Sequence, residues 1–278
     1  MTVLEKINEE FIGVMKKEPG VCGAWEFGSG MHGNKDKYSD IDIVFLVAPD
    51  EFQSLDGKLK SLVSQVCDTV HIFWGEDFNN DKIKNYGCIL ERDDKLVQYD
   101  IFLLNQGEIR DPMCQLHYRE LKKENIFFDT EGEVAKLIDS VPMGEKWSAD
   151  LERLIETYWL HMYMCIKYIC RKDYFKLQGV VRILQDTHAS LLLCKYDNIT
   201  WGGTANKLNY INTFSEEHLK EYYCSRDIEG CRINLEKSMK WFIEDVGEVC
   251  SPELQKKNEI ISDKLILTWA DRLILHRD

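Results

Sequence analysis

The spacing between two apolar runs constrains the fold of this chain more than any other feature. Val21–Phe27 and Ile41–Val47 both have the β-branched and aromatic composition of strands. A glycine-rich segment, Gly28–Gly33, follows the first run, and only six residues, 34–39, separate its last glycine from Asp40. Six residues cannot hold a crossover helix, so we predict that the two strands pair as an antiparallel hairpin.

The same glycines also satisfy the G-x-G-x-x-G pattern of dinucleotide-binding folds. That pattern requires its last glycine to open a helix that crosses over before the next strand. The short spacing after Gly33 leaves no room for that helix. The spacing therefore argues against a nicotinamide or flavin site.

Two aspartates, Asp40 and Asp42, stand at the head of the second strand. Side chains alternate between the faces of a strand, so Ile41 and Ile43 are expected in a core and both carboxylates on the opposite face. The two carboxylates are then rooted roughly 7 Å apart, close enough to share hard cations such as Mg²⁺. The alternative interpretation is a strand that begins with two solvated acids.

The glycine turn before these aspartates has the composition of a phosphate site. Gly28 and Gly30 allow the backbone to approach a bulky anion, and Ser29 offers a hydroxyl and an amide donor. A nucleoside triphosphate with its Mg²⁺ would match both the turn and the aspartates.

A third acid interrupts a later strand. Lys95–Leu104 has the pattern of a buried strand with Asp100 inside it. An unpaired buried acid is costly, so Asp100 needs a metal, a cation or a role in proton transfer. The alternative is an aspartate that closes a local turn or pairs with a lysine.

The segment Phe27–Val47 resembles the signature of the nucleotidyltransferase superfamily related to DNA polymerase β. The shared features are an apolar residue, Gly, Ser, a spacer of about ten residues and Asp-apolar-Asp-apolar. As a whole, the chain resembles the two-domain aminoglycoside adenylyltransferases and the larger lincosamide nucleotidyltransferases.

The resemblance implies roles for the three acids and the turn. Asp40, Asp42 and Asp100 would be the catalytic, Mg²⁺-binding residues, with Asp100 acting either as a metal ligand or as the general base. Gly28 and Ser29 would hold the β/γ end of ATP or another nucleoside triphosphate. The motif leaves the acceptor open.

The resemblance also implies nucleotide-binding lysines in the second half of the chain. Lys167 lies in a segment similar to the helix that carries a phosphate-side lysine in six-position aminoglycoside enzymes, with Trp159 also matching, and Lys207 follows in a similar turn. Alternatively, Lys167 simply extends from a helix face into solvent. The related enzymes bind their acceptors with acids of the helical domain, for which the chain offers Glu156, Asp173 and Asp186.

Charge and hydropathy restrict the partners and the compartment. A formal net charge of −13 and a pI near 5.1 argue against a nucleic-acid partner and favour a polycationic small molecule, although acidity for solubility alone is the alternative. A capping box at Thr2–Glu5 stands where a leader would be, and no apolar run approaches eighteen residues, so no membrane association is expected. Scattered cysteines without a C-x-x-C pair predict buried thiols in a reducing cytoplasm.

The pattern of elements predicts an α+β protein. Residues 1–143 are expected to form a nucleotidyltransferase α/β domain with a mixed sheet, and residues 144–278 a helical bundle, with Pro142–Gly144 at the boundary. Strands are expected at Val21–Phe27, Ile41–Val47, Thr69–Trp74, Tyr86–Arg92, Lys95–Leu104 and Asn125–Asp129. Helices are expected at Thr2–Met15, Pro49–Cys67, Glu131–Val141, Ser148 to the break at Arg171, Tyr174–Lys195, Ser215–Cys224, Ile228–Val249 and Pro252–His276.

The sequence therefore predicts a Mg²⁺-dependent nucleotidyltransferase. It would transfer a nucleoside monophosphate, AMP from ATP being favoured, to a hydroxyl of a small-molecule antibiotic, with an aminoglycoside as the favoured acceptor. The alternatives are a lincosamide acceptor, a protein acceptor as in antitoxin-type adenylyltransferases, and a non-catalytic binding module.

Overall fold

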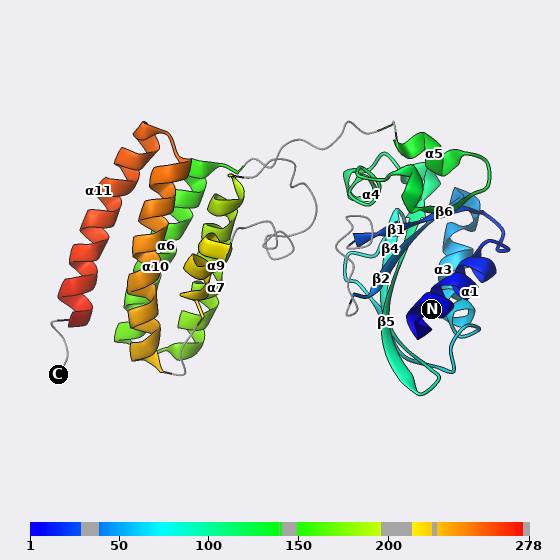
Figure 1. The fold of residues 1–278 in the computed structure, drawn as a ribbon, viewed down its shortest axis with the longest axis horizontal. Helices are drawn as coiled ribbons and strands as arrows, with labels where there is room; N and C mark the ends of the chain where they lie inside the picture. The colour runs from blue at the N-terminus through cyan, green and yellow to red at the C-terminus, as the bar shows by residue number, and fades with distance from the viewer. Residues whose placement is uncertain (29–38, 139, 141–148, 196–212, 224–226, 275–278) are drawn as a thin grey trace. The chain divides into compact units, whose positions relative to one another are not determined.

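The computed structural model describes residues 1–28, 39–138, 140, 149–195, 213–223 and 227–274 (Figure 1). The chain divides into two compact units, Met1–Gly144 and Glu145–Asp278. The first unit combines helices with a mixed six-stranded sheet, and the second is helical, which confirms the α+β prediction. The predicted boundary at Pro142–Gly144 lies outside the described residues. Among the described helices, none combines the length and apolar character that a membrane span requires.

The sheet of the first unit has the strand order β3-β4-β5-β2-β1-β6. Neighbouring strands are antiparallel except for the central pair β2 and β5, which is parallel. The antiparallel pairing of β1 with β2 confirms the predicted hairpin. The strands are β1 (Val21–Phe27), β2 (Ile41–Val47), β3 (Thr69–Gly75), β4 (Ile83–Arg92), β5 (Lys95–Asn105) and β6 (Ile126–Asp129).

Two helices, α1 (Val3–Met15) and α3 (Pro49–Val63), cover one face of this sheet (Figure 1). Thr2 and Glu5 form the predicted capping box of α1. Apolar side chains of both helices share a core with alternate residues of the central strands, including Ile41, Ile43 and Ile101. Short helices follow β5 and β6: η1 (Gln106–Glu108), α4 (Pro112–Gln115), η2 (Lys123–Asn125) and α5 (Glu133–Ile138).

Strand β4 is longer than its sequence pattern predicts. It begins at Ile83 rather than at Tyr86, and its first residues include Lys84 and Asn85. Asn85 is nevertheless buried, because the Asn79 side chain bonds its backbone and its own amide donates to the Ile101 carbonyl. The hydrophobic pattern of the sequence therefore does not reveal this part of the strand, because its polar residues form their hydrogen bonds inside the sheet.

The second unit contains the helices α6 (Leu151–Cys170), α7 (Tyr174–Leu193), α9 (Thr213–Lys220), α10 (Ile228–Val249) and α11 (Pro252–Trp269). Helix α6 packs against α7 and α11, whereas α10 packs against α7 and α11 and α9 against α7 and α10. Their apolar faces enclose a separate core that includes Tyr158, Leu184 and Phe242. The last predicted helix changes to a π-helical turn at Ala270–Ile274. The cysteine prediction fails at Cys170, which is exposed at the end of α6.

Candidate active site

The sheet brings two of the three predicted acids side by side. Asp42 and Asp100 are direct partners in the parallel pairing of β2 with β5. Neighbouring strands lie about 4.8 Å apart and paired residues share a face, so both carboxylates leave the same face of the sheet. Asp40 lies two residues before Asp42, just ahead of the start of β2 at Ile41. The neighbouring residues Ile41 and Ile101 point into the core, as the alternation predicts.

Two glycines give these carboxylates the space that they occupy. Gly28 follows β1 with a φ of +65°, in the left-handed region that glycine favours, and a Cβ there would overlap the Asp42 carboxylate. Gly87 is the β4 partner of Asp100, and a Cβ there would lie 3.1 Å from Asp100 Oδ1. A side chain at Gly28 or Gly87 would therefore occupy space that the carboxylates of Asp42 and Asp100 need.

Burial, and then electrostatic repulsion, disfavour the charged forms of the acids in this cluster. Burial raises the pKa of Asp42 to about 7, and the charges of Asp40 and Asp100 act in the same direction. Glu26 adds a smaller effect on the pKa of Asp42. Every charged group that acts on Asp42 in the described structure is therefore an acid.

Asp100 is in a similar environment with one compensating contact. Burial raises its pKa, and the negative charges of Asp40 and Glu76 also raise it. The Gln98 amide donates a hydrogen bond of 2.9 Å to Asp100 Oδ2, which opposes the rise in pKa. Half-buried acids that repel one another offer the oxygen ligands that Mg²⁺ takes, but the carboxylate oxygens of the three aspartates do not all lie within 4.8 Å of one another. Asp40, Asp42 and Asp100 are the residues that would hold it.

The predicted nucleotide-binding residues are only partly described. Gly28 lies against Asp42, whereas Ser29 and Lys207 fall outside the described residues. Lys167 is on α6 in the second unit, with its ammonium 4.8 Å from the centre of the Tyr168 ring. Trp159 is buried and its indole donates to Asn258 Oδ1. Nucleotide binding by Lys167 stays a prediction, and Trp159 is a core residue of the second unit.

The three acids considered for acceptor binding have structural partners in the second unit. Asp173 caps the N-terminus of α7 by accepting from the Lys176 amide. Asp186 pairs with Arg182 one turn earlier on α7. Glu156 accepts from Lys257 at 3.0 Å, across α6 and α11. These pairings leave Glu156 and Asp186 at the surface and give Asp173 a helix-capping role.

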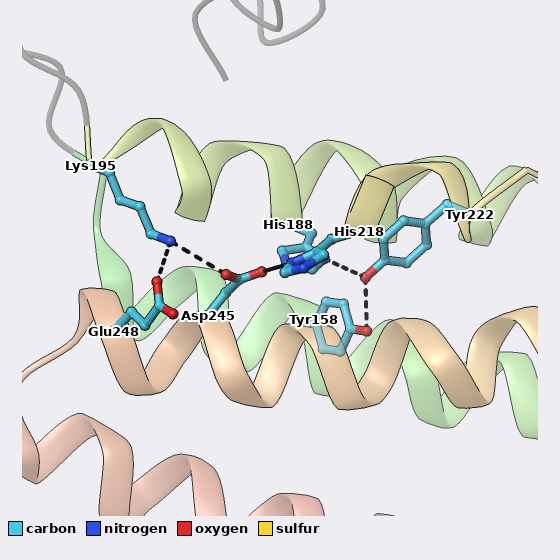
Figure 2. Close-up of polar contacts among 7 residues, drawn as sticks. All are labelled: Tyr158, His188, Lys195, His218, Tyr222, Asp245 and Glu248. Atoms are coloured by element: carbon cyan, nitrogen blue, oxygen red, sulfur yellow. Dashed lines mark hydrogen bonds and ion pairs between the residues drawn. The ribbon is translucent and has the colours of Figure 1, made fainter. Parts of the chain in front are cut away.

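A second polar cluster is buried in the helical unit, where Figure 2 shows His188 of α7, His218 of α9 and Lys195, which follows α7, converging on Asp245 of α10. His188 Nε2 and His218 Nδ1 each lie 2.8 Å from Asp245 Oδ2. Lys195 Nζ is 3.4 Å from Asp245 Oδ1 and also pairs with Glu248 (Figure 2). Three or more histidine, cysteine or acidic side chains whose potential metal-binding atoms all lie within 4.8 Å of one another could hold a metal ion. Among the described residues, His188, His218 and Asp245 are the only group that meets this condition.

The contacts of this cluster account for it without an ion. Both distances to Oδ2 are those of N–H···O bonds, and Lys195 already supplies a positive charge to the carboxylate. The other nitrogen of His188 contacts the Tyr222 hydroxyl, which lies 2.9 Å from that of Tyr158 (Figure 2). We therefore interpret the cluster as a structural network that ties α6, α7, α9 and α10 together.

Sequence reasoning missed three residues of the first cluster. Gly87 carried a usable signal, because an isolated glycine inside a strand pattern marks a close approach of another group. Gln98 and Glu76 gave none, since polar residues beside a turn are ordinary. Gln98 contacts Asp100 along the same strand, whereas the electrostatic effect of Glu76 on Asp100 depends on the pairing of β3, β4 and β5.

No protein-family model and no curated protein matches the chain. Among solved structures, it is similar to an aminoglycoside 6-adenyltransferase from Bacillus subtilis, with 9% identity and a TM-score of 0.39 over 96% of this chain and 99% of that one. It is also similar to a nucleotidyltransferase-like protein from Exiguobacterium sibiricum, with 10% identity and a TM-score of 0.30 over 89% and 78% of the two chains.

Proposed function

We propose that the chain is a Mg²⁺-dependent nucleotidyltransferase. The observation that carries this proposal is the direct pairing of Asp42 with Asp100 on adjacent parallel strands, with glycine on either side and, among the described residues, only acids raising the pKa of Asp42 by their charge. A stable protein gains nothing from three acids that repel one another unless a cation is bound there. A non-catalytic module would not need to keep that arrangement.

The proposed reaction is transfer of AMP from ATP to an acceptor hydroxyl. The hydroxyl oxygen forms a bond to the α-phosphorus as the bond to the bridging oxygen breaks, and pyrophosphate leaves. Bound Mg²⁺ supplies positive charge to the phosphate oxygens and to the departing group. The hydroxyl proton passes to a carboxylate of the site, for which Asp100 is the candidate, because burial raises its pKa and thereby its basicity.

The side chains of the chain have separate tasks in this proposal. Asp40 and Asp42 hold the cation in place, and Gly28 lets the backbone beside Asp42 come close to the triphosphate. The core residues Ile41 and Ile43 fix the strand that carries both acids. Positioning and charge compensation then carry the rate, since phosphoryl transfer leaves little covalent work to the protein.

An aminoglycoside is the favoured acceptor. The net charge of −13 attracts a polycationic molecule, and the two-domain aminoglycoside adenylyltransferases are the enzymes that the chain resembles. A lincosamide and a protein acceptor are the other two candidates. Neither has a feature of the described residues in its favour.

The experiment is a panel of aminoglycosides and lincosamides incubated with each nucleoside triphosphate, with and without Mg²⁺, and followed by pyrophosphate release. We expect release with an aminoglycoside, ATP and Mg²⁺ together, and none from Asp42→Asn. Full activity of Asp42→Asn would disprove the site. Absence of release across the whole panel would count against an antibiotic acceptor and favour a protein or metabolite.

A further inference from the structure

The row of paired residues that contains both acids continues to an exposed tryptophan. Asp42 pairs with Asp100, Asp100 with Gly87 on β4, and Gly87 with Trp74 on the edge strand β3. Residues paired directly across strands share a face of the sheet. Trp74 therefore stands on the same face as the two carboxylates, at the end of the row away from Gly28.

Gly87 leaves an opening between the indole and the nearer carboxylate. A Cβ on Gly87 would lie 3.1 Å from Asp100 Oδ1 and 3.8 Å from Trp74 Cε3. Both side chains therefore border the space that a side chain at Gly87 would occupy. The absence of one leaves the indole in reach of any molecule held against Asp100.

The indole of Trp74 is exposed together with a second apolar side chain on the same face of β3. Trp74 is 55% exposed and its neighbour on the same face, Ile72, is 51% exposed. Phe73, which points to the other face, instead stacks on Tyr86 with ring centroids 4.5 Å apart. Tryptophan is mostly buried in folded proteins, and exposed apolar surface beside polar groups marks ligand sites.

The charges around the indole select a cation. Asp100 is the nearest charged group along the row, and Glu76, directly after β3, acts electrostatically on it. An indole face attracts cations, and two carboxylates nearby increase that attraction. A triphosphate would be repelled at this end, and the proposed function places it at the Gly28 end of the row.

We propose that Trp74 binds the acceptor, with its indole face against a ring of a polycationic amino sugar and an ammonium group of that sugar at Glu76. This inference rests on the proposed function, because it assumes that the acids mark the reacting hydroxyl. It adds the surface that orients the acceptor. Trp74 is a binding residue and takes no part in proton transfer.

The test compares Trp74→Ala and Trp74→Phe with the control Leu96→Ala. Leu96 is 65% exposed on β5, on the same face as Asp100 but four residues away, near the turn to β4. Steady-state kinetics of pyrophosphate release give the KM for the aminoglycoside and for ATP separately. Titration of each protein with the aminoglycosides of the panel, followed by calorimetry, gives acceptor binding without turnover.

Loss of one cation–π and stacking contact predicts a roughly three- to tenfold rise in acceptor KM and Kd for Trp74→Ala. The KM for ATP is expected to be unchanged, Trp74→Phe to recover most of the loss, and Leu96→Ala to match the wild type. A rise in the ATP KM alone would show that the indole holds the nucleobase, and unchanged constants would also refute the proposal.

The two proposals fail separately. Binding of an aminoglycoside that depends on Trp74 but gives no pyrophosphate release would keep this surface and reject the transfer reaction. Pyrophosphate release that is unaffected by Trp74→Ala would keep the reaction and reject the surface. Absence of aminoglycoside binding by the wild-type protein would refute the surface outright.

Discussion

At the scale of single residues, the acid cluster lowers the stability of the protein when no cation is bound. The pKa of Asp42 is raised to about 7 from its usual 3.8, so between these two pH values the folded protein holds a proton that the unfolded chain has lost. The free energy of unfolding is therefore not reduced by Asp42 below pH 3.8. It decreases as the pH rises from 3.8 toward 7, because the folded protein must then carry a charge that its surroundings disfavour. A bound divalent cation would remove this penalty.

We accordingly expect Asp42→Asn to unfold at a higher temperature than the wild type at pH 8 in EDTA, because it removes a half-buried charge surrounded by acids. Addition of Mg²⁺ should raise the melting temperature of the wild type and leave that of Asp42→Asn nearly unchanged. Differential scanning calorimetry measures both. Asp263→Asn, at an exposed position of α11, is the control and should behave as the wild type. Equal responses of Asp42→Asn and the wild type to Mg²⁺ would count against the metal site.

Substitutions of Gly28 and Gly132 separate the effect of backbone strain from the effect of a contact with Asp42. Gly28→Ala should lose about 1–2 kcal/mol of stability from its left-handed backbone and should also lose turnover, because the new methyl group displaces the Asp42 carboxylate. Gly132 is the matched control: its φ is +74° and nothing lies within 4 Å of a Cβ there. Gly132→Ala should therefore lose similar stability and keep its activity. Urea unfolding and pyrophosphate release measure the two effects, and an active Gly28→Ala would contradict this reading of the turn.

At the scale of elements, the hairpin and the central strands could be predicted because their signals are local. The short spacing after Gly33 fixed the antiparallel pairing of β1 with β2, and alternation around Ile41 and Ile43 fixed which face holds the acids. The start of β4 could not be predicted, since Asn85 is polar and its burial depends on Asn79 and Ile101. The position of Trp74 beside Asp100 depends on two successive strand pairings and has no local signal.

His117, which follows α4, makes the first unit sensitive to acid. Burial lowers the pKa of His117 to about 4, and its ring packs between Phe27 and Phe102. Below pH 6.5 the unfolded chain binds a proton that the folded protein does not, so stability falls as the pH drops from 6.5 to 4, by at most about 3 kcal/mol. His117→Leu should flatten this slope in urea titrations at successive pH values.

The helices of the second unit depend on Asp245. Asp245→Asn removes the charge that faces His188, His218 and Lys195, and a broken buried ion pair costs about 3–5 kcal/mol. Glu248→Gln, at an exposed partner of the same lysine, should cost less than about 1 kcal/mol. Urea unfolding followed by far-ultraviolet circular dichroism measures both variants. A wild-type melting temperature that EDTA lowers in the absence of added metal would contradict the structural interpretation of this cluster and indicate a bound ion.

At the scale of the whole molecule, the surplus of acids should make acceptor capture depend on salt. The net charge of −13 attracts a polycation over distances that salt screens, with a Debye length of about 10 Å at 0.1 M. We expect the aminoglycoside KM to rise several-fold between 50 mM and 500 mM KCl. An acceptor with a single positive charge should show a much weaker dependence. An aminoglycoside KM that is independent of salt would count against an electrostatic contribution to acceptor binding.

The pairing of Asp42 with Asp100 also has a consequence for how the protein gains activity. The two acids are far apart in the sequence, and α3, β3 and β4 lie between the strands that carry them. Parallel pairing across such a distance is slow to form because the loop must close before any contact compensates for the lost entropy. No hairpin or helix that forms early contains both acids. Any turnover measured during refolding would therefore come only from molecules in which β2 and β5 have already paired.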